Sequence, residues 1–471
     1  MQRLADDETQ LNVDGATLPG LRGLRDLLRQ RRGVRAVLAN IGWLWADSAV
    51  LFVASSVAGI IVARALGPAD YGLLGYATGF MGLFVPLAGL GLMDLAIRDL
   101  VASKVPAERI LGTTFALQAA GALLAVLLAW ACGLALRDDP LTRRVTLIAC
   151  LSMLATPLNV PAYWFAARVR SKYAVWARDG ALLVGTVLRG ALALSGASVV
   201  VFAWLAVVQA FLAGLALLAL SRGRLPDLRT WTASLSEAGR MLREAWPLLA
   251  AGLAVALYMK IDLVMLGQLA GPDEVGQYTA AVRLSELWHV VPVAISLSVF
   301  PALVRARHRQ THDSDGAPWM QAFYDLMAGL GYLIAVPVSL LGVPVARLVY
   351  GQQYAASGPV LVVHIWTFLF VCLGLARGRW LVAANLNRLL LYTSLIGAAV
   401  NVGLNLLLIP RFGAQGAAWA TVASQTAANY GACLVWPQLR EAWAQMTRAL
   451  LLPLRLRSAW HGAKAVWRSA A

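Results

Sequence analysis

Long apolar runs alternate with short polar segments along most of the chain. The runs recur from Val37 to Pro437, and each is about twenty residues long, enough for a helix to cross a hydrocarbon core of ~30 Å. We therefore predict an all-α polytopic membrane protein with about twelve transmembrane helices. The predicted spans are 37–63, 71–96, 110–136, 145–166, 176–196, 199–220, 245–269, 276–303, 319–343, 357–377, 388–409 and 413–437.

Composition supports the membrane class. The 471 residues are 59% hydrophobic and 14% charged, whereas soluble domains carry roughly 25% charged residues. The cysteines fall inside apolar runs without a CxxC pattern, which is typical of core packing rather than of disulfide or metal chemistry. They are Cys132, Cys150, Cys372 and Cys433.

Basic residues indicate how the chain is oriented. Most of the 40 Lys and Arg lie in the two tails and in the loops that follow even-numbered spans. Short loops rich in Lys and Arg stay on the cytoplasmic side, so we predict that both termini are cytoplasmic. The formal net charge of +16 is then a topology signal, and we expect membrane lipids but no nucleic acid as partners.

A repeated motif divides the chain into two halves. Leu66–Gly72 reads LGPADYG and Ala270–Gly276 reads AGPDEVG. Six spans per half place both halves in the same orientation, which predicts parallel repeats about an axis along the membrane normal. The predicted organisation is a tail with a basic amphipathic helix, an N-lobe, a linker, a C-lobe and a basic tail with an interfacial helix; these are 1–36, 37–220, 221–244, 245–437 and 438–471.

Four charged residues lie in the second repeated hairpin. Placing a charge inside a membrane costs free energy, so we expect these residues to have a structural or functional role. Asp262 and Arg283 lie at nearly equal distance from the Pro272–Asp273 turn, and so do Lys260 and Glu286. At 1.5 Å per residue the first pair lies about 15 Å from the turn. We predict that each pair meets across adjacent helices. The pairs either fix helix register by neutralising one another or line a cleft that holds an anionic headgroup.

Other ionisable residues add candidates for the same cleft. Arg189 stands alone in its span, and arginine suits bidentate phosphate contact. Together with Lys260 and Arg283 it predicts a cationic cleft. His289 and His364 could carry protons or simply join neighbouring helices.

Charged residues near the cytoplasmic ends of spans have two alternative roles. Asp47, Asp94 and Arg98 could form an inner gate or cap helices at the interface. Arg377 and Arg379 are expected to anchor the chain at the cytoplasmic surface.

Three stretches resemble a known family. LGPADYGLLGYA, MKIDLVMLGQLAGPDEVGQYTAAVRLSELWHVVPVAI and GAQGAAWATVASQ are similar to the Wzx-type polysaccharide flippases of the MOP exporter superfamily, which also contains the lipid II flippase and the MATE exporters. The resemblance implies a V-shaped bundle with a cationic cleft. It also implies transfer of an undecaprenyl-pyrophosphate-linked oligosaccharide from the cytoplasmic to the periplasmic leaflet of a bacterial inner membrane.

The implied activity involves no covalent chemistry and no cofactor, so the resemblance predicts a transporter rather than an enzyme. Its implied partners are the lipid-linked oligosaccharide, membrane lipids, and polysaccharide polymerase and assembly proteins.

Two other functions predict features that differ from those of this chain. A cation-coupled, MATE-like small-molecule exporter predicts an acidic cleft, whereas the deep charges here lean positive. A membrane-embedded glycan polymerase or ligase predicts a long external loop, which this chain lacks, and no HExxH, P-loop or GxSxG motif is present.

Overall fold

The regular structure of the chain is helical throughout the described ranges. The computed structural model describes residues 56–136, 139–296, 317–384 and 386–455. Eight helices in these ranges are long and apolar enough to cross a membrane, which confirms the all-α membrane class. The exact number of spans and the sides of the termini stay predictions. The predicted amphipathic tail helix, most of the first span with Asp47, the end of the eighth span and residues 456–471 lie outside the described ranges.

The first half begins with helical residues 56–89, which the positive φ of Gly67 divides into helix 56–66 and helix 68–89. Further elements are α2 (Leu92–Ala102), α3 (Ala107–Leu136), α4 (Pro140–Cys150), η1 (Leu151–Asn159), α5 (Val160–Ala167), α6 (Lys172–Leu194) and α7 (Val199–Ser221). The predicted fourth span is therefore broken into α4, a 3-10 segment and α5. Pro157 lies inside that segment and Pro161 opens α5, and proline removes helical hydrogen bonds.

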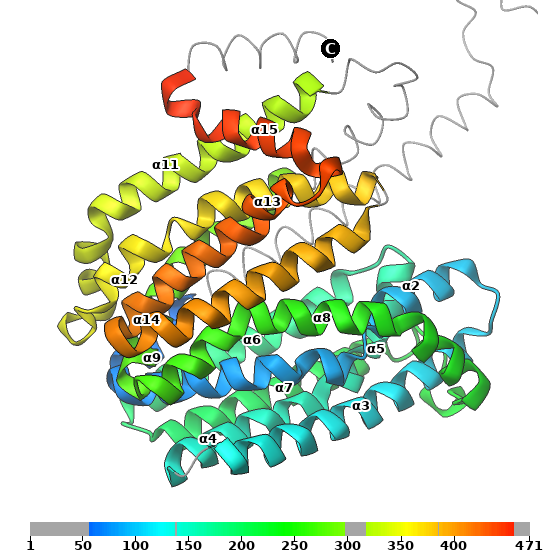
Figure 1. The fold of residues 1–471 in the computed structure, drawn as a ribbon. Coiled ribbons are helices and arrows are strands. Elements are labelled where there is room, and N and C mark those ends of the chain that lie inside the picture. Colours follow the sequence, from blue (N-terminus) through cyan, green and yellow to red (C-terminus); the bar gives the residue numbers. More distant parts are fainter. Residues whose placement is uncertain (1–55, 137–138, 297–316, 385, 456–471) are drawn as a thin grey trace, which may run out of the picture.

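The second half is joined through the linker, which contains η2 (Leu228–Thr230). Its elements are α8 (Leu235–Leu269), α9 (Pro272–Glu286), η3 (Leu287–His289), helical residues 290–296, α11 (Ala317–Tyr350), η4 (Gln352–Tyr354), α12 (Ser357–His364), α13 (Thr367–Ala383), α14 (Asn387–Asn429), η5 (Gly431–Leu434), η6 (Pro437–Leu439) and α15 (Arg440–Leu450). In Figure 1, α3, α4 and α7 of the first half lie along one side of the bundle, and α11, α13 and α15 lie along the other.

Four glycines turn the chain between consecutive helices. Gly67, Gly271, Gly351 and Gly413 have φ values of 74°, 92°, 92° and 53°, a region that glycine adopts at little cost. Pro272 follows directly and opens α9, where its fixed φ suits the first helical position. Contacts among these four turns place them at one end of the bundle, which we call the turn end.

The two halves interlock at the turn end through hydrogen bonds. The Arg64 guanidinium donates to the carbonyls of Leu348 and Val349 at 2.6 and 2.7 Å, and a cation at these last carbonyls of α11 is favourable. Tyr354 donates its hydroxyl to the carbonyl of Ala63 at 2.8 Å. The end of the first helix, before the Gly67 turn, is thereby fixed to the Gly351 turn of the second half.

Packing against a twofold-related partner explains two more glycines. A Cβ at Gly72 would lie 1.7 Å from the carbonyl oxygen of Pro272, and a Cβ at Gly276 would lie 1.9 Å from that of Pro68. Gly72 and Gly276 hold the same position in the repeated motif, as do Pro68 and Pro272. The contact is therefore reciprocal, as a twofold axis requires.

The buried core is shared at the turn end and divided elsewhere. One cluster mixes both halves around the turns and includes Tyr71, Tyr278 and Tyr354. At the opposite end, one cluster belongs to the second half and includes Phe323, while another packs the first half against the start of α8 and includes Trp164. The halves thus diverge away from the turn end, in agreement with the predicted V-shaped bundle.

The basic C-terminal segment, predicted as an interfacial helix, packs against the protein. Helix α15 buries Ala442, Met446 and Ala449, and Tyr332 of α11 donates a hydrogen bond to the carbonyl of Leu450 at 2.8 Å. It lies beside α11 in Figure 1. Its apolar face therefore covers the second half of the protein.

Three of the four cysteines are buried as expected. Cys132 is instead exposed on α3, among the apolar side chains of a membrane-facing helix.

Candidate functional site

Three adjoining pockets share lining residues, and we call them together the central cavity. Two of them lie between the halves, and the third lies within the second half. The arginine pocket is lined by Arg189 and Arg283, with Tyr71, Thr78 and Thr279. The lysine–glutamate pocket shares Arg283, Thr78 and Thr279 with it and adds Lys260, Glu286 and Tyr350. The histidine pocket shares Lys260 and Glu286 and adds Asp262, Tyr278, His289, His364, Thr421 and Gln425.

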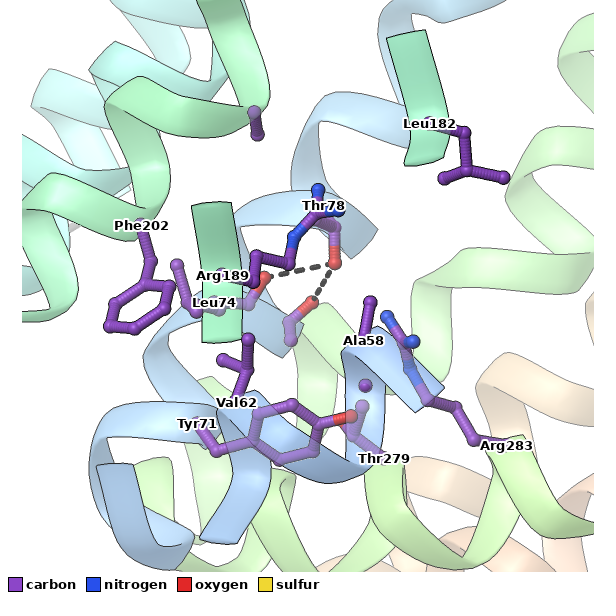
Figure 2. A pocket seen from close by; sticks show the side chains of 13 residues that line it. Ala58, Val62, Tyr71, Leu74, Thr78, Leu182, Arg189, Phe202, Thr279 and Arg283 are labelled. Atoms are coloured by element: carbon purple, nitrogen blue, oxygen red, sulfur yellow. Dashed lines mark hydrogen bonds between the residues drawn. The ribbon is translucent and has the colours of Figure 1, made fainter. Parts of the chain in front are cut away.

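The arginine pocket receives one guanidinium from each half. Arg189 comes from α6 and Arg283 from α9, and Figure 2 shows both reaching the same pocket. Arg189 donates to Oε1 of Gln209 on α7 at 2.6 Å, which fixes its direction. Arg283 lies where the opposing residue is Gly59: a Cβ there would come within 2.5 Å of its Nη1. Glycine at this position leaves room for the guanidinium.

Hydroxyl groups complete the arginine pocket. Tyr71 is 3% exposed, and the Arg283 guanidinium carbon lies 6.0 Å from the centre of its ring. Within the described part of the chain, the Tyr71 hydroxyl and the Thr279 Oγ1 have no hydrogen-bond partner. No carboxylate is among the described residues that line this pocket. Two guanidiniums and free hydroxyls in such surroundings suit an anion with several oxygens.

Lys260 and Glu286 line the two remaining pockets together, but they do not form the predicted ion pair. No ion pair joins them in the described structure. Both side chains therefore present their charges to the cavity. Asp262 is a charge that acts on Lys260, and Arg283 is one that acts on Glu286, both without a direct ion pair among the described residues. An ammonium and a carboxylate in a membrane-embedded cavity are costly unless water, a ligand or a nearby opposite charge meets them.

Asp262 and Arg283 lie at matching depth but on different faces of the hairpin, so their predicted pairing is wrong. Asp262 is buried and accepts hydrogen bonds from the Tyr278 hydroxyl and from the amide of Leu263, while Arg283 faces the first half. Depth along two antiparallel helices follows from residue number, whereas direction depends on rotation about each helix, where residues three or four apart share a face. The pairing rule ignored that rotation.

The histidines lie in the second half beside Asp262. The His364 Nδ1 lies 3.0 Å from the Ser285 hydroxyl, and its ring meets the Tyr278 ring edge-on at 5.8 Å. His289 stacks on Phe368 at 5.7 Å, and its buried Nε2 has no partner within the described residues. His364 is thus a helix contact as well as a pocket residue, and any proton transfer by either histidine stays a prediction.

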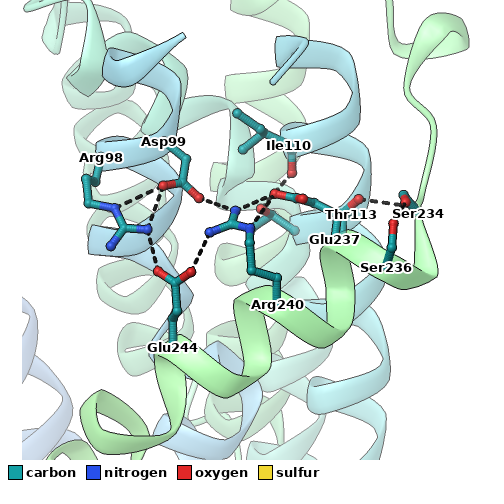
Figure 3. Close-up of polar contacts among 10 residues, drawn as sticks. Arg98, Asp99, Ile110, Thr113, Ser234, Ser236, Glu237, Arg240 and Glu244 are labelled. Carbon is teal, nitrogen blue, oxygen red and sulfur yellow. Dashed lines mark hydrogen bonds and ion pairs between the residues drawn. The ribbon is translucent and has the colours of Figure 1, made fainter. Parts of the chain in front are cut away.

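Arg98, which was expected either to form an inner gate or to cap its helix, takes part in an ion network that joins α2 to α8 (Figure 3). Whether it acts as a gate stays a prediction. Arg98 meets Asp99 at 2.8 Å and Glu244 at 2.6 Å. Arg240 bridges Asp99, Glu237 and Glu244. Asp94 is exposed in the first turn of α2 and lines none of the three pockets. The i, i+3 and i, i+4 spacing of Glu237, Arg240 and Glu244 could have revealed this network.

Arg377 is a buried arginine, not the surface anchor we predicted. It is 3% exposed and donates to the carbonyls of Ala428 and Asn429 at 2.8 and 3.3 Å. These are the last carbonyls of α14, where a cation is favourable. A second hydrogen bond reaches Thr393 Oγ1 at 3.2 Å. The charge counting rule failed here because it assigns basic residues near span ends to the surface.

Sequence reasoning missed the hydroxyl groups of the cavity. Tyr71 lies inside the first repeated motif and Tyr278 lies two residues after the second, at positions that are not equivalent in the repeat, so only their closeness to the turns was an available signal. Thr279 and Gln209 carry no charge, so the sequence held no signal that Thr279 lines the cavity or that Gln209 accepts a hydrogen bond from Arg189. In the described ranges, no group of three or more His, Cys, Asp or Glu is placed to hold a metal ion.

Comparison with known proteins gives matches in sequence. A family model described as polysaccharide biosynthesis protein matches residues 37–307. The probable flippase AglR of Haloferax volcanii is 34% identical over 179 residues, so the match spans 36% of this chain and 36% of that relative.

Solved structures match over most of the chain at low identity. The lipid II flippase MurJ in an inward closed conformation has a TM-score of 0.68 at 13% identity, covering 86% of this chain and 91% of its own. An inward-facing MATE family transporter of the MOP superfamily has a TM-score of 0.67 at 14% identity, covering 85% and 96%. A MOP superfamily transporter from Pyrococcus furiosus, described as having a binding pocket of reverse polarity, has a TM-score of 0.57 at 15% identity, covering 90% and 96%. These likenesses show a MOP-type fold.

Proposed function

Because the chain belongs to the polysaccharide biosynthesis protein family, we propose that it is a flippase for a lipid-linked oligosaccharide. The substrate would be an undecaprenyl-pyrophosphate-linked saccharide, moved from the cytoplasmic to the periplasmic leaflet of a bacterial inner membrane. Polysaccharide polymerase and assembly proteins would act on the product. The name of the archaeal relative, probable flippase, supports the transport class.

One observation carries the proposal: the arginine pocket takes Arg189 from the first half and Arg283 from the second. A pyrophosphate bound there would contact both halves at once. Rocking of the halves would then change which side of the membrane reaches the pocket while the phosphate keeps its partners. The prenyl chain would remain in the lipid, where its burial costs nothing.

The sidedness of the cavity follows from the charge distribution. The turn end holds the loops that are poor in Lys and Arg, so it would face the periplasm. The interlock through Arg64, Tyr354 and the glycine contacts closes that end. This arrangement corresponds to a state ready to load from the cytoplasm.

The cavity fits a cation exporter less well. Of its two carboxylates, Asp262 is occupied by Tyr278 and Leu263, and the arginine pocket would repel a cationic drug. Lys260 lines the same two pockets as Glu286, so its positive charge also disfavours a cationic drug there.

Alanine substitution of each arginine in cells tests the proposal. In a strain without its own copy, Arg189→Ala and Arg283→Ala should reduce surface glycan at least tenfold, the effect of losing one charge-assisted contact. Membrane amounts of the protein should equal those of wild type by immunoblot. Arg109→Ala removes an exposed arginine on α3 outside the cavity and should leave glycan unchanged. Normal glycan in both cavity variants would refute the proposal.

A further inference from the structure

The central cavity has two chemically different regions. The arginine pocket offers guanidiniums and hydroxyls, which suit phosphate. The lysine–glutamate pocket offers an ammonium and a carboxylate, and neither is neutralised by the other. Phosphate needs no carboxylate and is repelled by one, so Glu286 must serve another part of the ligand.

The position of Lys260 is fixed by packing against the first half. A Cβ at Gly82 would lie 3.2 Å from the Lys260 Cγ, so the lysine stem runs over the backbone of helix 68–89. Glu286 is the last residue of α9, one helical turn beyond Arg283. Residues at this spacing share a helix face, so Glu286 presents its carboxylate beside the arginine pocket.

Buried polar atoms without partners continue from this region. Thr279 Oγ1 lines both the arginine and the lysine–glutamate pockets, and the Tyr258 hydroxyl, Thr367 Oγ1 and His289 Nε2 line the histidine pocket. Within the described residues none of these atoms has a hydrogen-bond partner. Buried polar groups nearly always form hydrogen bonds, so we expect these atoms to bond to a partner from outside the chain.

The required partner carries both donors and acceptors. Carboxylate oxygens, hydroxyl oxygens and the unprotonated nitrogen of a neutral imidazole accept hydrogen bonds, while ammonium and hydroxyl groups donate them. A sugar ring provides hydroxyls that do both. Arg283 and Thr279 line the arginine pocket and the lysine–glutamate pocket alike, so a sugar attached directly to pyrophosphate would reach the second pocket from the first.

We propose that Lys260 and Glu286 form the saccharide subsite of the cavity, where the sugar nearest the pyrophosphate is selected by its hydroxyl pattern. This inference rests on the proposed flippase function and extends it to the specificity of that site. Glu286 accepts hydrogen bonds from sugar hydroxyls, and Lys260 donates to hydroxyl or ring oxygens. The arginine pocket supplies affinity that is the same for every sugar.

Binding of defined short-chain probes to the full-length protein in lipid nanodiscs tests the subsite. The probes are farnesyl pyrophosphate without sugar and farnesyl pyrophosphate carrying glucose, galactose or mannose. In wild type, at least one sugar should tighten binding relative to the sugar-free probe by on the order of tenfold, as expected for hydrogen bonds to charged groups. In Glu286→Gln and Lys260→Met the ratio of sugar-bearing to sugar-free affinity should fall to about one, and the preference among sugars should disappear.

Matched variants control for charge and folding. Lys104→Met and Glu441→Gln make the same charge changes at exposed positions outside the cavity and should leave every affinity unchanged. Glu286→Asp keeps the carboxylate and should retain part of the sugar preference. Size-exclusion profiles verify that each variant is folded.

The failures of the subsite and of the flippase proposal can be told apart. If wild type binds all four probes equally, or if Glu286→Gln and Lys260→Met weaken sugar-free and sugar-bearing probes alike, the subsite is wrong and the pyrophosphate site stands. If wild type binds no probe, or if Arg189→Ala does not weaken the sugar-free probe, the proposed function itself is wrong and the subsite is rejected with it.

Discussion

The two repeated hairpins share one turn motif but carry different residues on the faces where they meet. Aligned on that motif, Gly79 and Gly82 of the first hairpin occupy the positions of Arg283 and Glu286 in the second. The first hairpin therefore contributes a face with glycines and without charged side chains at these positions. The second contributes Lys260, Asp262, Arg283 and Glu286 to the cavity.

Their contacts are complementary in size. Arg283 lies over Gly59, while the residue equivalent to Gly59 is Leu263, and Leu263 lies over Gly79. In each contact a large side chain meets a glycine. The two hairpins lie too close together for two large side chains to face each other across the twofold axis. The difference between the hairpins therefore explains how charges of the second half can reach the centre of the protein.

The interlocking glycines at the turn end should show the largest effect on stability. Gly72→Ala or Gly276→Ala places a Cβ within 2 Å of a carbonyl oxygen of the other hairpin, and the backbone cannot yield as a side chain does. We expect a loss of at least about 3 kcal/mol, measured by thermal unfolding of the purified protein. Gly180→Ala, where a Cβ meets nothing within 4 Å, should be neutral or slightly stabilising. Equal tolerance of Gly72→Ala and Gly180→Ala would show that the hairpins do not meet as described.

The glycine beneath Arg283 should matter for transport rather than for folding. In Gly59→Ala the new Cβ would lie 2.5 Å from Nη1 of Arg283, and the flexible guanidinium can move away from the arginine pocket. We expect surface glycan to fall about tenfold, as for the loss of a charged hydrogen bond, with little change in thermal stability. Gly190→Ala, which has open space around it, is the control. Full transport by Gly59→Ala would mean that the position of Arg283 is not set by this glycine.

The buried Asp262–Tyr278 contact exists only in the second hairpin, where the first has Ala58 and Leu74 at the equivalent positions. Tyr278→Phe removes a hydroxyl that meets both Asp262 and Thr421. It should destabilise the protein by about 1–3 kcal/mol, because a buried carboxylate loses a partner. Asp262→Asn should cost less, and the double variant should cost less than the sum of the two. Additive losses in thermal unfolding would argue against a coupled pair.

The ion network between α2 and α8 should show the smallest effect. Arg98 and Glu244 have side chains 57% and 37% exposed, and exposed ion pairs contribute about 0–1 kcal/mol. Arg98→Gln should therefore lower stability by less than about 1 kcal/mol and leave glycan export unchanged, as should Asp94→Asn. Loss of export in Arg98→Gln with normal protein amounts would instead support an inner gate at this position.

Features tied to composition and repetition could be predicted from the sequence. The helical membrane class follows from the apolar runs, and the meeting of the halves follows from the repeated Gly-Pro turns. The choice of Arg189, Lys260 and Arg283 as cavity residues rested on the cost of charge in a membrane, and the structure places all three along one cavity. Their role as substrate contacts stays a prediction.

Features that depend on rotation and on tertiary contacts could not be predicted. The separation of Asp262 from Arg283 depends on which face each helix turns to its neighbours. The burial of Arg377 depends on the place where α14 happens to end, and the docking of α15 depends on an apolar strip of α11. None of these leaves a signal in residue spacing alone.

The central claim is that paired arginines from opposite halves carry a pyrophosphate-linked saccharide across the membrane. Proteoliposomes containing the purified full-length protein and a fluorescent undecaprenyl-pyrophosphate-linked saccharide test it directly, because an external enzyme or quencher reports which leaflet holds the headgroup. We predict rapid exchange between leaflets with wild type and with Arg109→Ala, and exchange no faster than in protein-free liposomes with Arg189→Ala and Arg283→Ala. Equal exchange rates with wild type and the two cavity variants would contradict the account.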